Sequence, residues 1–175
     1  MNFKFENLDL ETRKLMIAEI NSDIQGQKLY FSKRFNENGH TLYAELLLNA
    51  AEFGDEKSLG NSLKENDCFA EKEARNGKNG ITLAKVPDNA NTVLAESEFN
   101  RFYIRAIAQR AIDSGLKLIV YRARYSDSPR SGSEEKIDLE ISAEELLLDL
   151  RNNIGIDTVL GLPPGPNSGL SVKLI

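Results

Sequence analysis

Residues 91–113 constrain the fold most, because they are apolar around most of their circumference when they are drawn as a helix. Phe99, Tyr103 and Ile107 cover one broad arc of this helix, and the polar stripe that remains is narrow. A helix of this kind is normally buried near the centre of a domain. Gly115 follows in the position of a helix C-cap. We therefore expect a central helix that ends at this glycine, with the other elements packed around it.

The remaining elements are predicted from hydrophobic periodicity and from turn residues. Residues 116–125 form the strongest strand candidate, and further strands are predicted at 28–35 and 81–86 and at 170–175. Helices are predicted at 9–24, 41–53, 55–66 and from Ser142 to Leu150. Residues 66–80 are polar and rich in glycine and asparagine, which predicts a flexible loop.

Helices and strands alternate in this sequence, but without the strict order of a parallel α/β protein. The predicted fold class is therefore α+β, with a small mixed or antiparallel sheet packed against several helices and a helical hairpin near residues 41–66. The length of 175 residues suits a single domain over 1–175. Residues 161–175 are rich in proline and glycine and form a possible arm with a terminal strand.

Composition argues against several classes of function. Cys68 is the single cysteine and His40 the single histidine, so an internal disulfide and a multi-histidine metal site are excluded. The sequence has neither the P-loop pattern nor the dinucleotide-binding glycine pattern. We therefore expect no catalytic residue, no metal site and no cofactor. With no apolar run of about 20 residues and no apolar signal region, we expect no membrane association and a soluble, cytoplasmic protein.

Charge is segregated along the chain, although the formal net charge is only −5. Residues 101–130 contain seven cations and two acids, whereas residues 131–150 contain seven acids and one lysine. Two interpretations stay open. The two blocks can pair with each other inside the molecule, or the cationic block can form a surface that meets a partner.

Arginine and tyrosine are concentrated in the cationic block. Two arginines lie one turn apart on the exposed stripe of the central helix, and two more share one face of the strand 116–125, with tyrosines on its other face. Such residues are common at protein interfaces, and they also bind phosphates and stack on bases. Ion pairing with the acids of 144–149 is the competing interpretation. The predicted binding residues are Arg101, Arg105, Arg122, Arg124, Tyr121 and Tyr125.

These observations favour a non-catalytic protein-interaction or assembly protein. It would dock a protein partner or another copy of itself, through the Arg/Tyr surface or through the C-terminal arm. Nucleic-acid binding through the 101–130 patch is the alternative. A carboxylate-metal nuclease is a third and weaker hypothesis, because Glu134 and Lys136 lie in a predicted loop rather than in the strand that should follow Asp88.

Overall fold

The computed structural model describes residues 3–78, 80–125, 132–155, 158, 160–162 and 169–175. In these residues the chain forms an α+β fold of helices and two small antiparallel sheets, which confirms the predicted class. The helices are α1 (Leu10–Gln25), α2 (Glu37–Phe53), α3 (Glu56–Glu65), α4 (Ala90–Ser114) and α5 (Ala143–Asn152), with a short 3-10 helix at Glu134–Lys136. The strands are β1 (Lys72–Gly77), β2 (Gly80–Lys85), β3 (Leu118–Arg122), β4 (Glu140–Ile141) and β5 (Leu170–Leu174).

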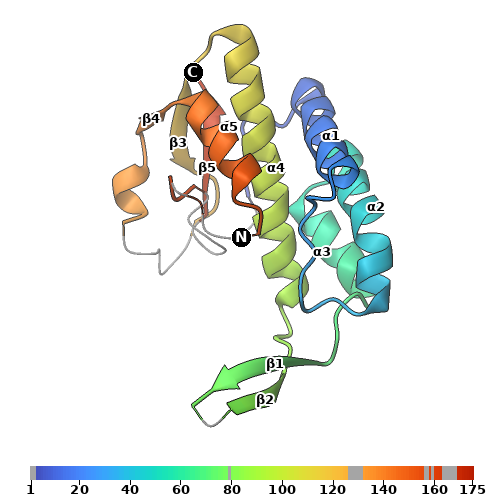
Figure 1. Ribbon diagram of the computed structural model, residues 1–175. Helices are drawn as coiled ribbons and strands as arrows, with labels where there is room; N and C mark the ends of the chain where they lie inside the picture. Colours follow the sequence, from blue (N-terminus) through green and yellow to red (C-terminus); the bar gives the residue numbers. More distant parts are fainter. Residues whose placement is uncertain (1–2, 79, 126–131, 156–157, 159, 163–168) are drawn as a thin grey trace.

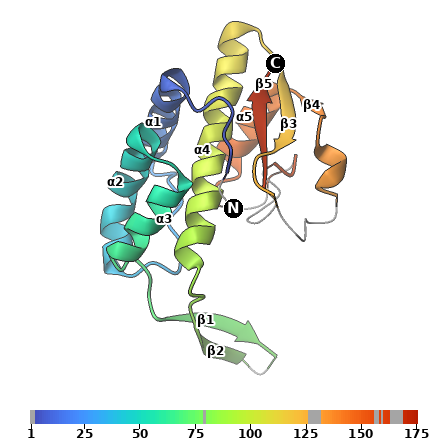
Figure 2. The same ribbon diagram turned by 180° about the vertical axis from the view of Figure 1, so that it is seen from behind.

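Helix α4 is the centre of the molecule, as its apolar circumference predicts (Figure 1). Helices α1 to α3 lie on one side of it, and the larger sheet and α5 lie on the other (Figures 1 and 2). Phe99, Tyr103 and Ile107 are fully buried. Gly115 ends the helix with a φ of 68°, the left-handed conformation that glycine adopts without strain.

The larger sheet has the strand order β4-β3-β5, and both pairings are antiparallel. Leu118 and Val120 of β3 are buried, and Val120 lies opposite Val172 of β5. The strands predicted at 116–125 and 170–175 are therefore confirmed. The terminal strand completes the sheet of its own chain and packs against α4.

The helical hairpin predicted near 41–66 is formed by α2 and α3, and side-chain caps fix where each helix begins. The Asn36 side chain accepts a hydrogen bond from the Gly39 backbone N–H at 3.0 Å, so α2 begins before the predicted residue 41. Asp55 and Ser58 form a reciprocal capping box at the start of α3. Ser142 caps α5 at the predicted position.

The strand predicted at 28–35 is wrong. Its residues make turns, in which the Lys28 backbone N–H donates to Asp23 and that of Phe35 donates to Ser32. A single antiparallel bridge between Phe35 and Phe69 is the strand-like pairing found there among the described residues. Leu29 and Phe35 are buried and contribute to the core, whereas Phe31 is 37% exposed. Several backbone groups of this segment have local hydrogen-bond partners in place of a neighbouring strand.

The flexible loop predicted at 66–80 is also wrong in its second half. Residues 72–77 form β1, which pairs with β2 in a hairpin whose register places Lys72 opposite Lys85 and Gly77 opposite Gly80. The strand predicted at 81–86 is thus correct as a strand, but it does not join the larger sheet. Sequence periodicity missed β1 because almost all of its side chains are exposed on both faces.

The proline-rich part of the predicted C-terminal arm, residues 163–168, lies outside the described residues. No helix in the described part of the chain is long and apolar enough to cross a membrane.

Candidate docking surface

Arg105 does not face solvent, contrary to the expectation from the polar stripe of the central helix. It is 1% exposed, and its guanidinium donates to Asp23 at 2.6 and 2.8 Å and to Glu19 at 2.7 Å. Both acids belong to α1, which packs against α4. The stripe of α4 is polar because it packs against these acids of α1, and not because it faces solvent.

Arg101 is buried one turn earlier on the same stripe. Its Nη1 donates to the Asn153 backbone carbonyl at 2.8 Å, and its Nε lies 3.9 Å from Glu98. Burial raises the pKa of Glu98 to about 7, although the positive charges of Arg101 and Arg105 act against this rise. Arg101 and Glu98 thus form an ion pair three residues apart on α4.

The predicted residues of β3 and the chain after it are also mostly engaged within the molecule. Arg122 pairs with Glu134 at 2.5 Å, and Arg124 pairs with Glu96 at 3.4 Å. The Tyr121 hydroxyl donates to the Lys4 carbonyl at 2.8 Å. Tyr125 is 59% exposed and is the one member of the six that is largely open to solvent. The six residues therefore do not form one open surface, and the acids that pair with the four arginines lie outside 144–149.

Two highly exposed apolar side chains belong instead to the hairpin of β1 and β2, which projects from one end of the molecule (Figures 1 and 2). Ile81 and Leu83 are 75% and 73% exposed and point to the same side, because alternate residues of a strand share a face. The register adds Ala74 opposite Leu83, and Lys72 opposite Lys85. We call this surface the hairpin face; its members are Lys72, Ala74, Asn76, Ile81, Leu83 and Lys85.

The other face of the hairpin ties it to the body of the protein. Glu73 is buried there and receives two hydrogen bonds from Arg34, at 2.6 and 3.1 Å, and two from Arg75, at 3.0 and 2.7 Å. Arg34 and Arg75 together hold the pKa of Glu73 down at about 2. Because paired guanidinium and carboxylate groups have a fixed mutual geometry, this contact sets the direction in which the hairpin projects.

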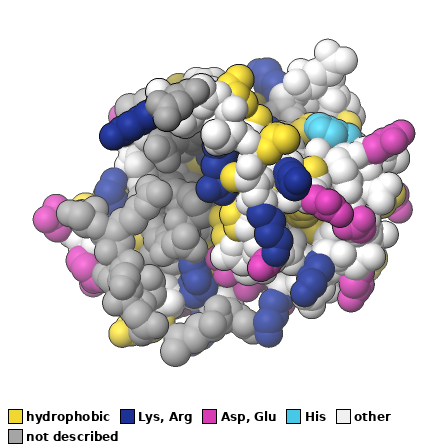
Figure 3. Space-filling model, turned by 90° about the horizontal axis from the view of Figure 1, so that it is seen from below, with side chains coloured by type: hydrophobic (Ala, Val, Ile, Leu, Met, Phe, Trp, Pro, Cys, Tyr) yellow, Lys and Arg dark blue, Asp and Glu magenta, His cyan; other side chains and the backbone are white. Residues whose placement is uncertain are grey.

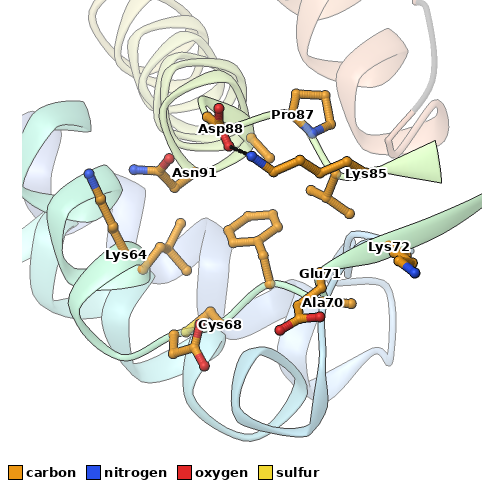
Figure 4. A pocket seen from close by; sticks show the side chains of 14 residues that line it. Lys64, Cys68, Ala70, Glu71, Lys72, Lys85, Pro87, Asp88 and Asn91 are labelled. Carbon is orange, nitrogen blue, oxygen red and sulfur yellow. Dashed lines mark ion pairs between the residues drawn. The ribbon is translucent and has the colours of Figure 1, made fainter.

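A pocket of about 580 Å³ opens at the base of the hairpin, between the end of α3 and the start of α4. Its apolar lining comes from Leu63, Phe69, Val86, Pro87 and Ala90. Its charged lining is balanced, with three lysines and three acids: Lys64, Lys72, Lys85, Asp67, Glu71 and Asp88. Figure 4 shows the Lys85–Asp88 ion pair, 2.6 Å long, across the pocket from Cys68.

Lys72 and Lys85 line the pocket and also belong to the hairpin face, so the two form one continuous surface. Figure 3 looks at this end of the molecule and shows lysine and arginine side chains beside apolar ones. Such a surface can take an extended segment that places one apolar side chain in the pocket and others along Leu83 and Ile81.

Cys68 does not give this surface a reactive thiol. Its side chain is fully buried, and burial raises the pKa of the thiol. The thiolate is the nucleophilic form, so a raised pKa makes the group inert at neutral pH. In the described residues, no three His, Cys, Asp or Glu side chains are grouped so that they could hold a metal ion.

Sequence reasoning missed this surface, although one signal pointed to it. Ile81 and Leu83 alternate with polar or small neighbours, and glycines stand on both sides of the turn before them. An exposed hairpin produces this pattern as readily as a half-buried strand does.

In comparisons with known proteins, no family model, no curated protein and no solved structure matches this chain.

Proposed function

We propose that this protein is a non-catalytic interaction or assembly protein that docks a protein partner through the hairpin face and the pocket at its base. The exposure of Ile81 and Leu83, side by side on a hairpin that projects from the body, is the observation that carries this proposal. The function class is the one expected from the sequence, and the docking site moves from the Arg/Tyr residues to the hairpin.

An isolated two-stranded hairpin has little stability of its own, and a third strand or a packed layer normally supports it. Here the hairpin face is open along its whole length. Both outer edges also lack a further strand among the described residues, which leaves backbone groups for a partner strand. A partner that adds a strand would supply the missing support, and this is a common way of binding extended segments.

A protein partner fits this surface better than a nucleic acid does. The hairpin face combines aliphatic side chains with two lysines and contains no aromatic residue on which a base could stack. The arginines on which the nucleic-acid alternative depended contact acids or backbone groups of their own chain. Nucleic-acid binding is therefore an outcome that the test below must be able to report.

The test places a photo-crosslinking residue at Leu83 in the full chain, in the cells that make the protein. The matched control carries the same residue at Thr82, which lies on the opposite face of β2. We expect discrete protein adducts from position 83 and few from position 82. Equal labelling at the two positions, or adducts with nucleic acid, would contradict the proposal.

A further inference from the structure

We propose that the occupant of the hairpin face is a second copy of this chain, bound at its acidic segment 138–148, so that copies join head to tail. This inference rests on the proposed function and names its partner. The hairpin and the acidic segment lie at opposite ends of the molecule (Figures 1 and 2). One chain therefore cannot bring its own two surfaces together, whereas two chains can.

The acidic segment contains β4 and the first part of α5. It carries four acids and no cation of its own, and one of the acids, Glu140, already pairs with Lys117 at 2.9 Å. It also exposes two leucines, Leu139 at 54% and Leu148 at 61%. Its four exposed acids are Asp138, Glu140, Glu144 and Glu145. The segment thus offers what the hairpin face lacks, which is negative charge beside apolar area.

The charges of the two surfaces are complementary. The hairpin, residues 72–85, contains four cations and one acid, a formal charge of +3. Since the whole chain carries −5, the remaining residues carry −8. The basic hairpin of one copy is therefore attracted to the acidic remainder of another, and most strongly to a segment without cations.

The hairpin face places Lys72 and Lys85 directly opposite each other in the register. The Lys85 ammonium group already pairs with Asp88 at 2.6 Å, and Figure 4 shows the Lys72 side chain extending away from this pair. Among the described residues, Lys72 has no ion pair. A carboxylate from a second copy can therefore pair with Lys72, whereas a second hairpin would bring like charges to this face.

The backbone geometry also suits this contact. Both ribbon views place β2 on the side of the hairpin that faces away from the helices. Strand β4 is the outer strand of its sheet, with β3 as its neighbour among the described residues. Strand β2 of one copy can therefore lie along β4 of the next, with Ile81 and Leu83 against Leu139. Because the two surfaces differ, the contact repeats from copy to copy and builds a ring or a filament.

The test uses two surface variants of the purified full chain and measures mass by size exclusion with light scattering over a range of concentrations. The hairpin variant is Ile81→Glu with Leu83→Glu, and its matched control is Thr82→Glu on the opposite face. The acidic-segment variant is Leu139→Lys with Leu148→Lys. Its matched control is Phe53→Lys, at an apolar residue that is more exposed than either leucine and lies at the end of α2. Circular dichroism checks that each variant is folded.

We expect wild type and both controls to grow beyond a dimer as concentration rises, and to dissociate as salt screens the charges. Each surface variant alone should be a monomer. An equimolar mixture of the two should double in mass and stop there, because one intact hairpin face meets one intact acidic segment. A second hairpin variant, in which an Asn-Gly turn replaces residues 72–85, should behave as the first does in this mixture.

Three results would overturn the inference in different ways. If wild type stays monomeric at every concentration while Leu83 crosslinks to a different protein, the second-copy inference fails and the proposed function stands. If the acidic-segment variant still forms dimers and the hairpin variant does not, the contact joins two hairpins. If wild type is monomeric and the photo-crosslinking residue at position 83 gives no adduct, both proposals fail.

Discussion

Replacing the buried Glu98 with glutamine should make the protein more stable at neutral and alkaline pH. The folded-state pKa of this side chain is about 7, because burial disfavours its charged form, whereas its ordinary value is 4.5. Between these two values the folded protein keeps the proton that the unfolded chain has lost. The folded state then binds more protons, so the free energy of unfolding falls as pH rises through this window.

The size of the effect follows from the width of the window. Each pH unit between the two pKa values is worth about 1.4 kcal/mol, so the ionised carboxyl group destabilises the fold by about 3 kcal/mol above pH 7. Glutamine resembles the protonated acid and does not ionise. Glu98→Gln should therefore match wild type at about pH 4.5 and exceed it by about 3 kcal/mol at about pH 8.

The assay is urea unfolding followed by circular dichroism at several pH values across this range. Glu52→Gln, which removes an exposed carboxyl group on α2, is the matched control and should follow wild type at each pH. Every other titrating group is shared by the proteins compared, so the difference between the Glu98→Gln and wild-type curves isolates this one side chain. If the free energies of unfolding of Glu98→Gln and wild type differ by the same amount from acid to alkaline pH, the reasoning is refuted.

Three further substitutions test other parts of the structure. Glu73→Gln should leave thermal unfolding of the core unchanged but speed amide exchange and tryptic cleavage in the hairpin. In wild type, the contact of the Glu73 carboxylate with Arg34 and Arg75 is fully present above the ordinary pKa of the carboxyl group. This contact should be lost only as pH falls towards 2. Arg105→Met leaves two buried carboxylates without this partner and should lower the free energy of unfolding by about 3–5 kcal/mol in urea titration. Gly39→Ala would place a Cβ 2.3 Å from the Cys68 carbonyl oxygen and should lower that free energy by about 1–3 kcal/mol. Gly60→Ala, whose nearest neighbour would be 3.5 Å away, should not lower it.

The elements that sequence predicted well are those whose own residues determine them. The central helix carries its apolar arc along its full length, and Asp55, Ser142 and Gly115 mark helix ends through local hydrogen bonds or backbone conformation. Strand β3 was predictable because its buried side chains alternate. Such signals are local, and neighbouring elements do not have to be known in order to read them.

The errors share a different cause. Strand β1 has no buried apolar side to produce a pattern, and its pairing depends on β2 and on the contact of Glu73 with Arg34. Arg105 looked like a surface residue because a polar stripe that faces acids has the same sequence as one that faces water. Its two partners lie more than eighty residues away, so their position could come only from the packing of α1 on α4.

The hairpin enters and leaves the body of the protein at almost one point. The Val86 backbone N–H donates to the Glu71 carbonyl at 3.0 Å, and α3 packs directly against α4 on either side of that junction. The hairpin therefore resembles an insertion into the link between two helices that need no spacer. Its length and side chains can change while the core stays as it is, so selection can alter the surface that the hairpin presents without rebuilding what keeps the protein folded.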